Sequence, residues 1–296
     1  MNKEKITLFV MTQKGFEVLN ALITEIGPGI IHTVISCRDI NIAHDHYDEI
    51  KACCEQYDIP FYEKNEKPEI DTKYALAISW RWLINLKQIK LIVLHDSLLP
   101  LYRGFAPLVT ALINDEKTIG VTALFASEQY DRGDIIAQEA IAIEYPLTIK
   151  EAIGMIASLY AKIAVGLGKI ISSNIPIKSI PQNEEKASYC LWLDDTDYFI
   201  DWSGSATAIK RFIDAVGYPY KGACTWDGEK LCRIIDAIVE EDVVIANRIC
   251  GKLIFIKENE PVIVCGAGLL RIKKMTDDNN ENLLPLKKFR TRLFTP

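Results

Sequence analysis

His95 stands where an apolar run turns polar, in the segment LHDSLLPLYRG at residues 94–104. An imidazole titrates near neutral pH, so it can take up a proton during a reaction and return it. Asp131 lies 131 − 95 = 36 residues further on, in the loop EQYDRGD, and a carboxylate can orient an imidazole or stabilise its charged form. These residue types suit proton transfer, although a lone histidine at a strand end more often has no catalytic role.

The first 170 residues, roughly, must position these groups, and short apolar runs alternate there with amphipathic segments. The runs KITLFVM, IIHTVIS, YALAIS, LIVLH and GVTALFAS predict strands, whereas GFEVLNALITEI, YDEIKACCEQYDI and APLVTALINDE predict helices. Strands alternating with helices favour a parallel sheet covered on both faces. A final apolar stripe predicts a core-facing helix that closes this region, and it consists of Ile149, Ile153, Ile156, Tyr160, Ile163 and Leu167.

The carboxyl ends of the predicted strands indicate where a site would form, because ligands of parallel α/β sheets bind outside these ends. Residues 79–81 follow YALAIS, His95 ends LIVLH, and Asp131 follows GVTALFAS. We therefore expect three polar loops to meet at one rim of the sheet.

The remaining residues change character. The polar segment SSNIPIKSIPQNEEKAS carries two prolines and predicts a linker. SGSATAIKRFIDAVG then predicts a helix, with Ser203 or Ser205 as its N-cap and Gly217 at its end. The runs GACTW, KLCRIIDAIV, GKLIFIK and PVIVCGAGLLRIKK predict strands, and Asp227 with Gly228 predicts a hairpin turn between the first two. These strands indicate a small β-barrel.

Composition narrows the class of protein. Apolar residues make up 49% of the 296 residues, and the net charge of −6 argues against a broad nucleic-acid surface. We read no apolar run as long enough to span a membrane, and ITLFVM near the N-terminus as too short for a signal peptide. The eight cysteines form no CxxC pair and no metal-ligand spacing with the four histidines, so we expect reduced cysteines, a cytoplasmic protein and no metal.

The segments HDSLLPLYRG and GVTALFASEQYDRGDIIAQ together resemble the folate-dependent formyltransferase family. Its motif is HxSLLPKxxG, followed at this spacing by a loop that ends in Asp-x-Gly. The family includes methionyl-tRNA formyltransferase, amino-sugar N-formyltransferases and glycinamide ribonucleotide transformylase. IDWS at residues 200–203 and the barrel after it resemble the C-terminal domain of the tRNA and sugar branches.

The resemblance implies an α/β fold with two domains. Residues 1–175 would form a Rossmann-like parallel-sheet formyltransferase domain. Residues 176–200 would be the linker, and residues 201–296 would form a small OB-like β-barrel domain. A first helix without a GxGxxG loop excludes a dinucleotide-binding site.

The resemblance also implies a reaction, in which an amine attacks the formyl carbon of 10-formyltetrahydrofolate. His95 would accept the amine's proton, and Asp131 would orient the imidazole or stabilise its charged form. The folate would lie between the segment SWRWLI and the loop at 127–131. Its implied contacts are Trp80, Arg81, Trp82, Leu83, Ser127, Glu128 and Tyr130, although Trp80 is open to a core role. Implied substrate contacts are Ser97, Arg103 and Gly104, with Arg103 binding a phosphate or satisfying loop carbonyls.

Two positions depart from the family pattern. The family carries an asparagine two residues before the histidine, which donates to the formyl oxygen as negative charge develops, but Val93 stands here. Removing one such donor typically reduces the rate by about 10²–10³-fold. Another donor would be a water, a protonated His95 or a backbone N–H of the 103–107 turn. Leu101 replaces the lysine of the motif and removes an anion contact.

We expect a formyltransferase acting on a primary amine, with a nucleotide-linked amino sugar as substrate and a homodimer as a possible assembly. Methionyl-tRNA formyltransferase is the alternative, but SCRDINIAHDHYDEIK is mixed in charge and slightly acidic where that branch has a basic insertion. The run Lys287, Lys288, Arg290 and Arg292 could contact phosphates, although a solvated surface is the simpler interpretation. A binding module that kept the fold and lost the oxyanion donor is the hypothesis of another class.

Overall fold

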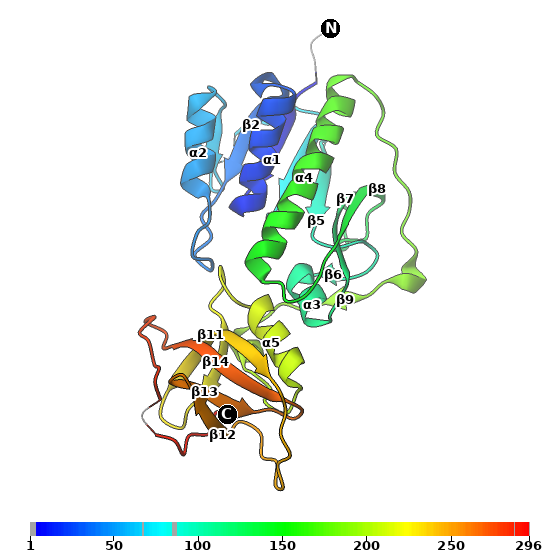
Figure 1. The fold of residues 1–296 in the computed structure, drawn as a ribbon. Coiled ribbons are helices and arrows are strands. Elements are labelled where there is room, and N and C mark those ends of the chain that lie inside the picture. Colours follow the sequence, from blue (N-terminus) through cyan, green and yellow to red (C-terminus); the bar gives the residue numbers. More distant parts are fainter. Residues whose placement is uncertain (1–3, 67, 85–87, 287, 296) are drawn as a thin grey trace. The chain divides into compact units, whose positions relative to one another are not determined.

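The computed structural model describes residues 4–66, 68–84, 88–286 and 288–295, and Lys287 of the basic run lies outside this set. The chain forms two compact units (Figure 1). The first unit contains residues 1–108, 117–143 and 151–191, and the second contains residues 109–116, 144–150 and 192–296. The pieces 109–116 and 144–150, which the sequence pattern placed in the first domain, therefore belong to the second unit.

A seven-stranded sheet forms the core of the first unit, in the order β3-β2-β1-β4-β5-β7-β8. Its strands are β1 (Ile6–Val10), β2 (Ile31–Ser36), β3 (Phe61–Glu63), β4 (Tyr74–Ile78), β5 (Lys90–His95), β7 (Thr118–Phe125) and β8 (Ile135–Ala142). Each of the five predicted strands is present. Every residue of β1 and β4 is buried, which explains their continuous apolar runs.

The sheet is mixed, and this corrects the expectation of a parallel sheet throughout. Strands β1 to β5 are parallel to their neighbours, but β7 runs antiparallel to β5, and β8 runs antiparallel to β7. His95 pairs with Thr122, whereas Phe125 at the end of β7 pairs with Ile92. The loop after β7 therefore starts at the opposite end of β5 from His95, and it reaches His95 only by turning back.

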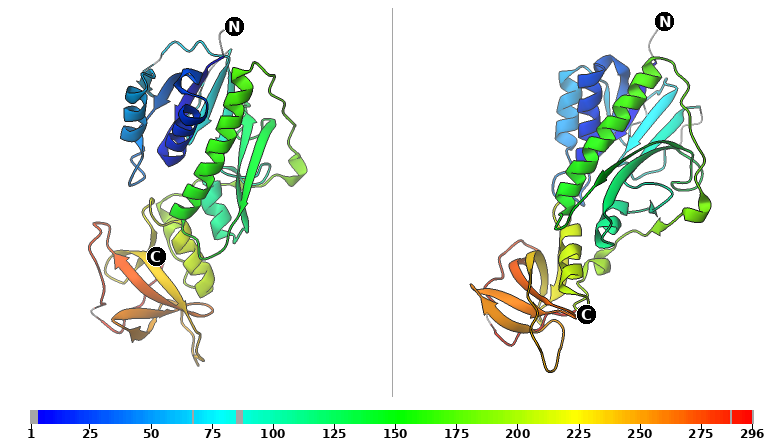
Figure 2. Two further views of the ribbon diagram at one scale, coloured as in Figure 1. Left: turned by 45° about the horizontal axis from the view of Figure 1, so that its top comes forward. Right: turned by 45° about the vertical axis from the view of Figure 1, so that its right-hand side comes forward.

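The described α-helices are α1 (Thr12–Glu25), α2 (Tyr47–Gln56), α3 (Pro107–Ile113), α4 (Ile149–Ser172) and α5 (Ala206–Ala215). Helices α1, α2 and α4 form one layer over the sheet (Figure 2). The other face is packed by Trp80, Ile84 and further side chains of the strands and loops, which cluster on Phe9 and Ala77. The expected cover of helices on both faces is thus replaced by one helical layer among the described residues.

Helix α4 carries the predicted apolar stripe. Ile149, Ile156 and Tyr160 are at most 1% exposed, whereas Ile153 is half-buried. By length and composition alone α4 is long and apolar enough to cross a membrane, but one such helix is weak evidence of a span, because core helices share these features. Its buried stripe shows the alternative use of such a helix, which is to cover a sheet.

The predicted linker is tied to the first unit over much of its length. It contains the short helical turn η2 (Glu184–Lys186) and strand β9 (Tyr189–Cys190), which pairs in parallel with β6 (Arg103–Gly104). Ile180 forms a two-way backbone bridge with Ile135 at 2.8 Å in both directions. The polar composition of this segment thus reflects its surface position and not a lack of contacts.

The second unit contains a five-stranded antiparallel sheet in the order β10-β11-β14-β13-β12. Its strands are β10 (Ala223–Trp226), β11 (Leu231–Glu240), β12 (Leu253–Lys257), β13 (Glu260–Val264) and β14 (Leu269–Thr276). Two further short helical turns are described, η1 (Pro28–Ile30) in the first unit and η3 (Asp195–Tyr198) in the second. The C-terminal segment joins both sheet edges, because Phe294 bridges Trp226 on β10 and Arg292 bridges Lys252 beside β12. A small β domain is therefore confirmed.

Local signals in this unit are also confirmed. Ser205 is the N-cap of α5, where its hydroxyl accepts the N–H of Ala208 at 3.2 Å. The Asp227 carboxylate accepts the N–H groups of Glu229 and Lys230 in the turn that joins β10 to β11. The run PVIVCGAGLLRIKK, expected to be strand-like, contributes to two strands, β13 and β14.

Candidate active site

His95 ends β5 on the face of the sheet that lacks the helical layer, and it is 8% exposed. Its Nε2 lies 2.8 Å from the carbonyl oxygen of Tyr102. Because a carbonyl oxygen can only accept, Nε2 carries the proton, and Nδ1 of the neutral ring has a free lone pair. Nδ1 lies 3.6 Å from Oδ1 of Asp131. A proton taken up at Nδ1 would therefore sit beside a carboxylate.

Asp131 is held from two sides. Its Oδ2 accepts the backbone N–H of Gly104 at 2.8 Å. Its carbonyl oxygen accepts from the side-chain amide of Gln182 at 2.7 Å, and the same nitrogen also donates to the carbonyl oxygen of Gly133 at 2.8 Å. The carboxylate is thus fixed by the motif turn, and its loop is fixed by a residue of the predicted linker.

Gly133 explains how the loop after β7 turns back. A Cβ atom there would lie 1.7 Å from the carbonyl oxygen of Phe125, so only glycine fits against the end of β7. The N–H of Phe125 donates to the carbonyl oxygen of Asp134 at 3.0 Å, which closes the loop. The Asp-x-Gly pattern thereby combines an acid with the turn that brings it to His95.

The turn after His95 is built from its own polar groups. The Ser97 hydroxyl donates to the carbonyl oxygen of Leu101 at 2.7 Å. Thr122 on β7 donates its hydroxyl to the Ser97 carbonyl oxygen at 2.6 Å and accepts the N–H of Leu99 at 3.0 Å. Ser97, expected to contact substrate, thus stabilises the turn in this structure.

Arg103 is fully buried and all five of its N–H groups donate to described side chains. Nε and Nη2 bind the amide oxygen of Gln182 at 3.1 and 2.7 Å, and Nη1 and Nη2 bind the Glu184 carboxylate at 2.8 Å each. Nη1 also donates to the Tyr189 hydroxyl at 3.3 Å. No donor remains for a substrate phosphate, so Arg103 anchors the segment around residues 182–189 to the motif turn in this conformation.

Glu184 is shared between two arginines. Hydrogen bonds from Arg103 and then from Arg132, which lies at 2.7 Å, lower the pKa of Glu184 to about 2. The carboxylate therefore stays ionised across the range in which an enzyme works. It joins the motif turn to the Asp131 loop through charge-assisted bonds.

Gly104 has a φ of 101°, and a Cβ there would lie 2.5 Å from the carbonyl oxygen of Cys190. Its N–H already binds Asp131, and the N–H groups of Arg103 and Phe105 donate to the carbonyl oxygens of Ser188 and Cys190. The three N–H groups at residues 103–105 are thus engaged, which removes them as the substitute oxyanion donor.

A second network lies under the site, and the sequence did not reveal it. Asp96 pairs with Lys14 at 2.6 Å and accepts from the Tyr160 hydroxyl, which also donates to the Leu94 carbonyl oxygen at 2.9 Å. Burial disfavours the charged form, yet the Lys14 ammonium and these hydrogen bonds hold the pKa of Asp96 below its ordinary value. The end of β5 is therefore clamped to α1 and α4. The only sign of this network in the sequence was an acidic residue, Asp96, directly after His95.

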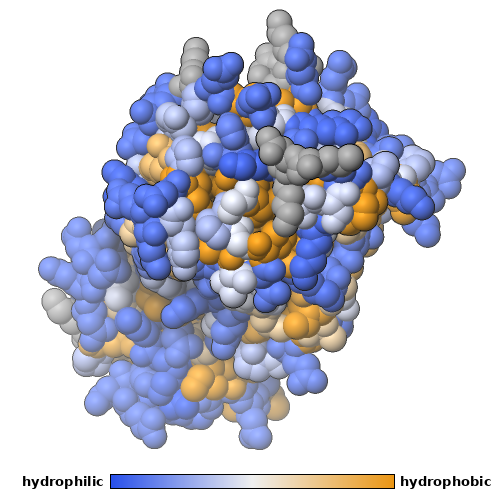
Figure 3. Space-filling model, turned by 90° about the horizontal axis from the view of Figure 1, so that it is seen from above, coloured by the Kyte–Doolittle hydropathy of each residue, from blue (hydrophilic) through white to orange (hydrophobic). Residues whose placement is uncertain are grey.

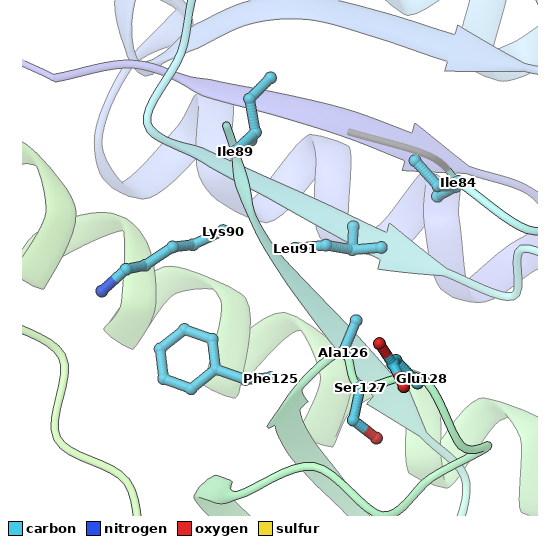
Figure 4. A pocket seen from close by; sticks show the side chains of 8 residues that line it. All are labelled: Ile84, Ile89, Lys90, Leu91, Phe125, Ala126, Ser127 and Glu128. Carbon is cyan, nitrogen blue, oxygen red and sulfur yellow. The ribbon is translucent and has the colours of Figure 1, made fainter. Parts of the chain in front are cut away.

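A hollow lies further along β5, beside Leu91 and the residues that follow β7. It is lined by Ile84, Ile89, Lys90, Leu91, Phe125, Ala126, Ser127 and Glu128. Figure 4 shows Leu91 on β5 and residues 126–128 on the segment that follows β7. The Lys90 ammonium points away from Leu91 and from these residues. Leu91 to His95 spans four residues, or about 13 Å of strand. Hydrophobic surface also gathers among hydrophilic side chains in the view of Figure 3.

The predicted folate contacts divide into three groups. Ser127 and Glu128 line the hollow. Tyr130 is exposed and its ring centre lies 6.1 Å from that of Phe105, close to the Asp131 loop. The structure does not place residues 80–83 among the lining side chains of the hollow.

Residues 80–83 make other contacts. Trp80 packs edge-on against Phe9, with ring centres 5.3 Å apart, as the core alternative expected. Arg81 forms an ion pair with buried Asp39, Trp82 carries the Lys64 ammonium over its ring, and Leu83 is 86% exposed. Their role towards folate stays a prediction.

Val93 lies between Leu91 and His95 on the same face of β5, and it is half-buried. It packs against the cluster of Leu99, Leu124 and Ile135. The position thus faces the space between the hollow and the imidazole, and it presents a methyl surface there.

Comparison with known proteins gives the family. Residues 70–183 match the formyl transferase family and residues 193–289 match the formyl transferase C-terminal domain. A methionyl-tRNA formyltransferase of Carboxydothermus hydrogenoformans is 30% identical over 220 residues, which cover 73% of this chain and 70% of that protein. The chain belongs to the formyl transferase family. A second relative, the methionyl-tRNA formyltransferase of Acetivibrio thermocellus, is 30% identical over 190 residues, or 64% of this chain and 60% of that protein.

The match to that second relative thus covers less than two thirds of the relative's own length. Among solved structures, the sugar 3N-formyl transferase WlaRD, crystallised in the presence of dTDP and 5-N-formyl-THF, superposes with a TM-score of 0.68. The two are 19% identical, and the match covers 92% of this chain and 97% of WlaRD. This likeness confirms the fold of a formyl transferase over nearly the whole chain.

Proposed function

We propose that this formyl transferase family member moves a formyl group from 10-formyltetrahydrofolate to a primary amine. The observation that carries the proposal is the protonation geometry of His95. Its Nε2–H donates to the Tyr102 carbonyl oxygen, which leaves the Nδ1 lone pair next to Asp131. A base in this state accepts one proton, and the carboxylate stabilises the imidazolium that results.

The chemical step balances without a metal or a redox partner. The amine nitrogen forms a bond to the formyl carbon, and the bond between that carbon and N10 of the folate breaks. The nitrogen loses one proton to Nδ1 of His95, and the imidazolium then gives that proton to N10 of the departing tetrahydrofolate, which returns His95 to its neutral form. Gly104 and Gln182 hold Asp131 in place throughout, so the charged imidazole keeps its partner.

The hollow beside Leu91 is the proposed place for the bicyclic ring of the folate. It is apolar on the strand side, and it offers Ser127 and Glu128 as polar groups on the other side. Such a mixture of apolar walls and few polar groups is typical of sites that bind small molecules. The formyl group would then lie towards Val93 and His95 along β5.

We propose a nucleotide-linked amino sugar as the acceptor. The cations around these loops already have carboxylate partners: Arg38 pairs with Asp48, Arg81 with Asp39 and Lys14 with Asp96, and Arg103 and Arg132 share Glu184. Since tRNA binding depends on cations that face phosphates, these pairs disfavour a tRNA acceptor. WlaRD, with its sugar substrate and dTDP, supports the same choice. The tRNA formyltransferases among the relatives support methionyl-tRNA as the second candidate.

Two measurements on the purified chain test the proposal. Release of tetrahydrofolate is followed with 10-formyltetrahydrofolate and either a set of nucleotide-linked amino sugars or methionyl-tRNA. Thermal unfolding is followed with each acceptor alone, because a ligand that binds only the folded chain raises the melting temperature. We expect turnover and stabilisation with one of the sugars.

Turnover with methionyl-tRNA and a salt-sensitive complex would instead favour the second candidate. A chain that binds folate but transfers formyl to no acceptor would point to a binding module, and a chain that does not bind folate would refute the proposal.

A further inference from the structure

A cluster of possible metal ligands lies in the loop between β2 and α2, apart from the site around His95. His44, His46 and Glu49 place their ligand atoms within 4.8 Å of one another. Nε2 of His44 lies 2.5 Å from Oε1 of Glu49, and Nδ1 of His46 lies 3.8 Å from the same oxygen. The two imidazole rings stack with centres 4.0 Å apart.

His46 makes the fewest polar contacts in the cluster. Its Nδ1 is buried, and it has no hydrogen-bond partner among the described residues. The distance of 3.8 Å to Glu49 is too long for a hydrogen bond. A buried polar atom without a partner is rare in folded proteins, and a bound ion would satisfy such an atom. His44 and Glu49 contact each other, but that contact does not supply a partner for Nδ1 of His46.

The backbone also aims His46 at this place. It precedes the first turn of α2 with a φ of 56°, which few residues other than glycine adopt, and its side chain does not cap the helix. The other side of its ring stacks on Phe16 at 5.8 Å.

Two nearby carboxylates bind other groups, so Glu49 is the carboxylate that can act as a ligand with the two histidines. Asp45 accepts the N–H groups of Asp39 and Tyr47, and Asp48 pairs with Arg38 at 2.5 Å. These bonds hold the loop around the cluster in place. The side chains of His44 and Glu49 are 51% and 37% exposed, so they can separate to admit an ion.

We propose that His44, His46 and Glu49 bind a divalent transition-metal ion, with zinc as the expected ion and water as the fourth ligand. Two imidazoles and a carboxylate suit zinc or cobalt and not calcium or magnesium, which prefer oxygen ligands. An ion there would satisfy Nδ1 of His46. It would also join the loop before α2 to the first turn of that helix. Strands β1 and β4 separate β2 from β5, so this site is distinct from the one around His95.

The test uses the full chain without a histidine tag, after treatment with a chelator. Zinc binding is measured by calorimetry, and cobalt binding by its visible absorption. We expect one ion per chain with a dissociation constant in the micromolar range or below. His44→Ala and Glu49→Gln should each weaken binding at least tenfold. His32→Ala, which removes a half-buried histidine on β2 outside the cluster, should leave binding unchanged.

The eight cysteines are the main competitors for zinc, and Cys37 lies at the start of the same loop. Cobalt bound to nitrogen and oxygen lacks the intense near-ultraviolet band of a cobalt thiolate. That band, if it appeared and vanished in Cys37→Ser, would overturn the proposal. Millimolar binding, or binding that both cluster variants retain, would overturn it as well. Circular dichroism confirms that each variant is folded.

Discussion

At the scale of single residues, the chemistry depends on which nitrogen of His95 carries the proton. The Tyr102 carbonyl oxygen assigns it to Nε2, and this leaves Nδ1 beside Asp131 as the proposed base. Nδ1, the free base position, lies next to the group that would stabilise its charge. Neither partner needs to move far for a proton to be taken up.

Replacing His95 with alanine should remove turnover and leave folate binding nearly unchanged. In the proposed mechanism the imidazole acts on the amine, whereas the proposed folate hollow is lined by other residues. A general base contributes about 10²–10⁴-fold in rate. Release of tetrahydrofolate measures turnover, and fluorescence titration measures folate affinity. An alanine variant with the parent's rate would exclude His95 as the base.

Replacing Val93 with asparagine should raise kcat, by up to about 10²–10³-fold if the amide donates to the formyl oxygen. Valine and asparagine are similar in size, and Val93 is half-buried between the hollow and His95. Its contact with Leu99 and Leu124 makes an unpartnered amide unfavourable, by about 1–3 kcal/mol in stability. Steady-state kinetics on both proteins decide the matter. A stable variant with unchanged kcat would show that another group already stabilises the oxyanion.

At the scale of elements, the segment expected as a linker helps to build the site. Gln182 accepts from Arg103 and donates to the carbonyl oxygens of Asp131 and Gly133. One side chain thus joins the motif turn to the loop of Asp131. The polar composition of this segment suggested a flexible linker. In the structure, its polar side chains form the hydrogen bonds that hold the site together.

Gln182→Leu should lower kcat while the chain stays folded. The variant leaves Arg103 with fewer acceptors and frees the Asp131 loop, and a displacement of about 1 Å at a catalytic group can reduce the rate by about 10²-fold. Gln56→Leu, at an exposed position on α2, is the matched control and should retain the parent's kcat. Equal kcat in the parent and Gln182→Leu would show that the segment does not position Asp131.

Tyr160→Phe should destabilise the chain by about 1–3 kcal/mol, since Asp96 and the Leu94 carbonyl oxygen lose a buried donor. The hydroxyl helps to hold the pKa of Asp96 below its ordinary value. Its contribution is therefore present above the unfolded pKa of about 3.9 and is lost as the pH falls below it. Urea unfolding of the parent and the variant at pH 7 and pH 3 measures both effects. A difference that grows on acidification would contradict this assignment.

At the scale of the whole molecule, the chain consists of two units, each with its own apolar core. Residues around Val262, Val264 and Leu269 form part of the core of the second unit, and the seven-stranded sheet forms that of the first. Every residue of the proposed folate and base sites lies in the first unit. The effect of a folate on stability should therefore be confined to that unit.

A folate analogue should raise the melting temperature of one calorimetric transition and leave another in place. At a ligand concentration of 100 times the dissociation constant, the stabilisation is about 2.7 kcal/mol, or several degrees for a unit of this size. Hydrogen exchange identifies the protected unit as the one that carries His95. Protection that appears only in the β domain would place the folate elsewhere.

The sequence by itself determined most strands and helices of the first unit. It also determined the spacing of 36 residues between His95 and Asp131 that the family motif requires. Continuous apolar runs predict buried strands, and three-to-four-residue periodicity predicted the stripe of α4, because these patterns depend on neighbours along the chain. The cap at Ser205 and the turn at Asp227 are local for the same reason. The resemblance to formyltransferases rested on a contiguous motif and was likewise visible without coordinates.

Only the tertiary structure decided the direction of β7, the partners of Arg103 and the clamp on Asp96. An apolar run has the same pattern in a parallel and an antiparallel strand, so its direction depends on which neighbour it pairs with. Arg103 pairs with a carboxylate 81 residues away, and Asp96 pairs with Lys14 across 82 residues. Such contacts arise when distant segments pack together. Local sequence does not encode them, because it specifies each segment's own periodicity but not its neighbours in space.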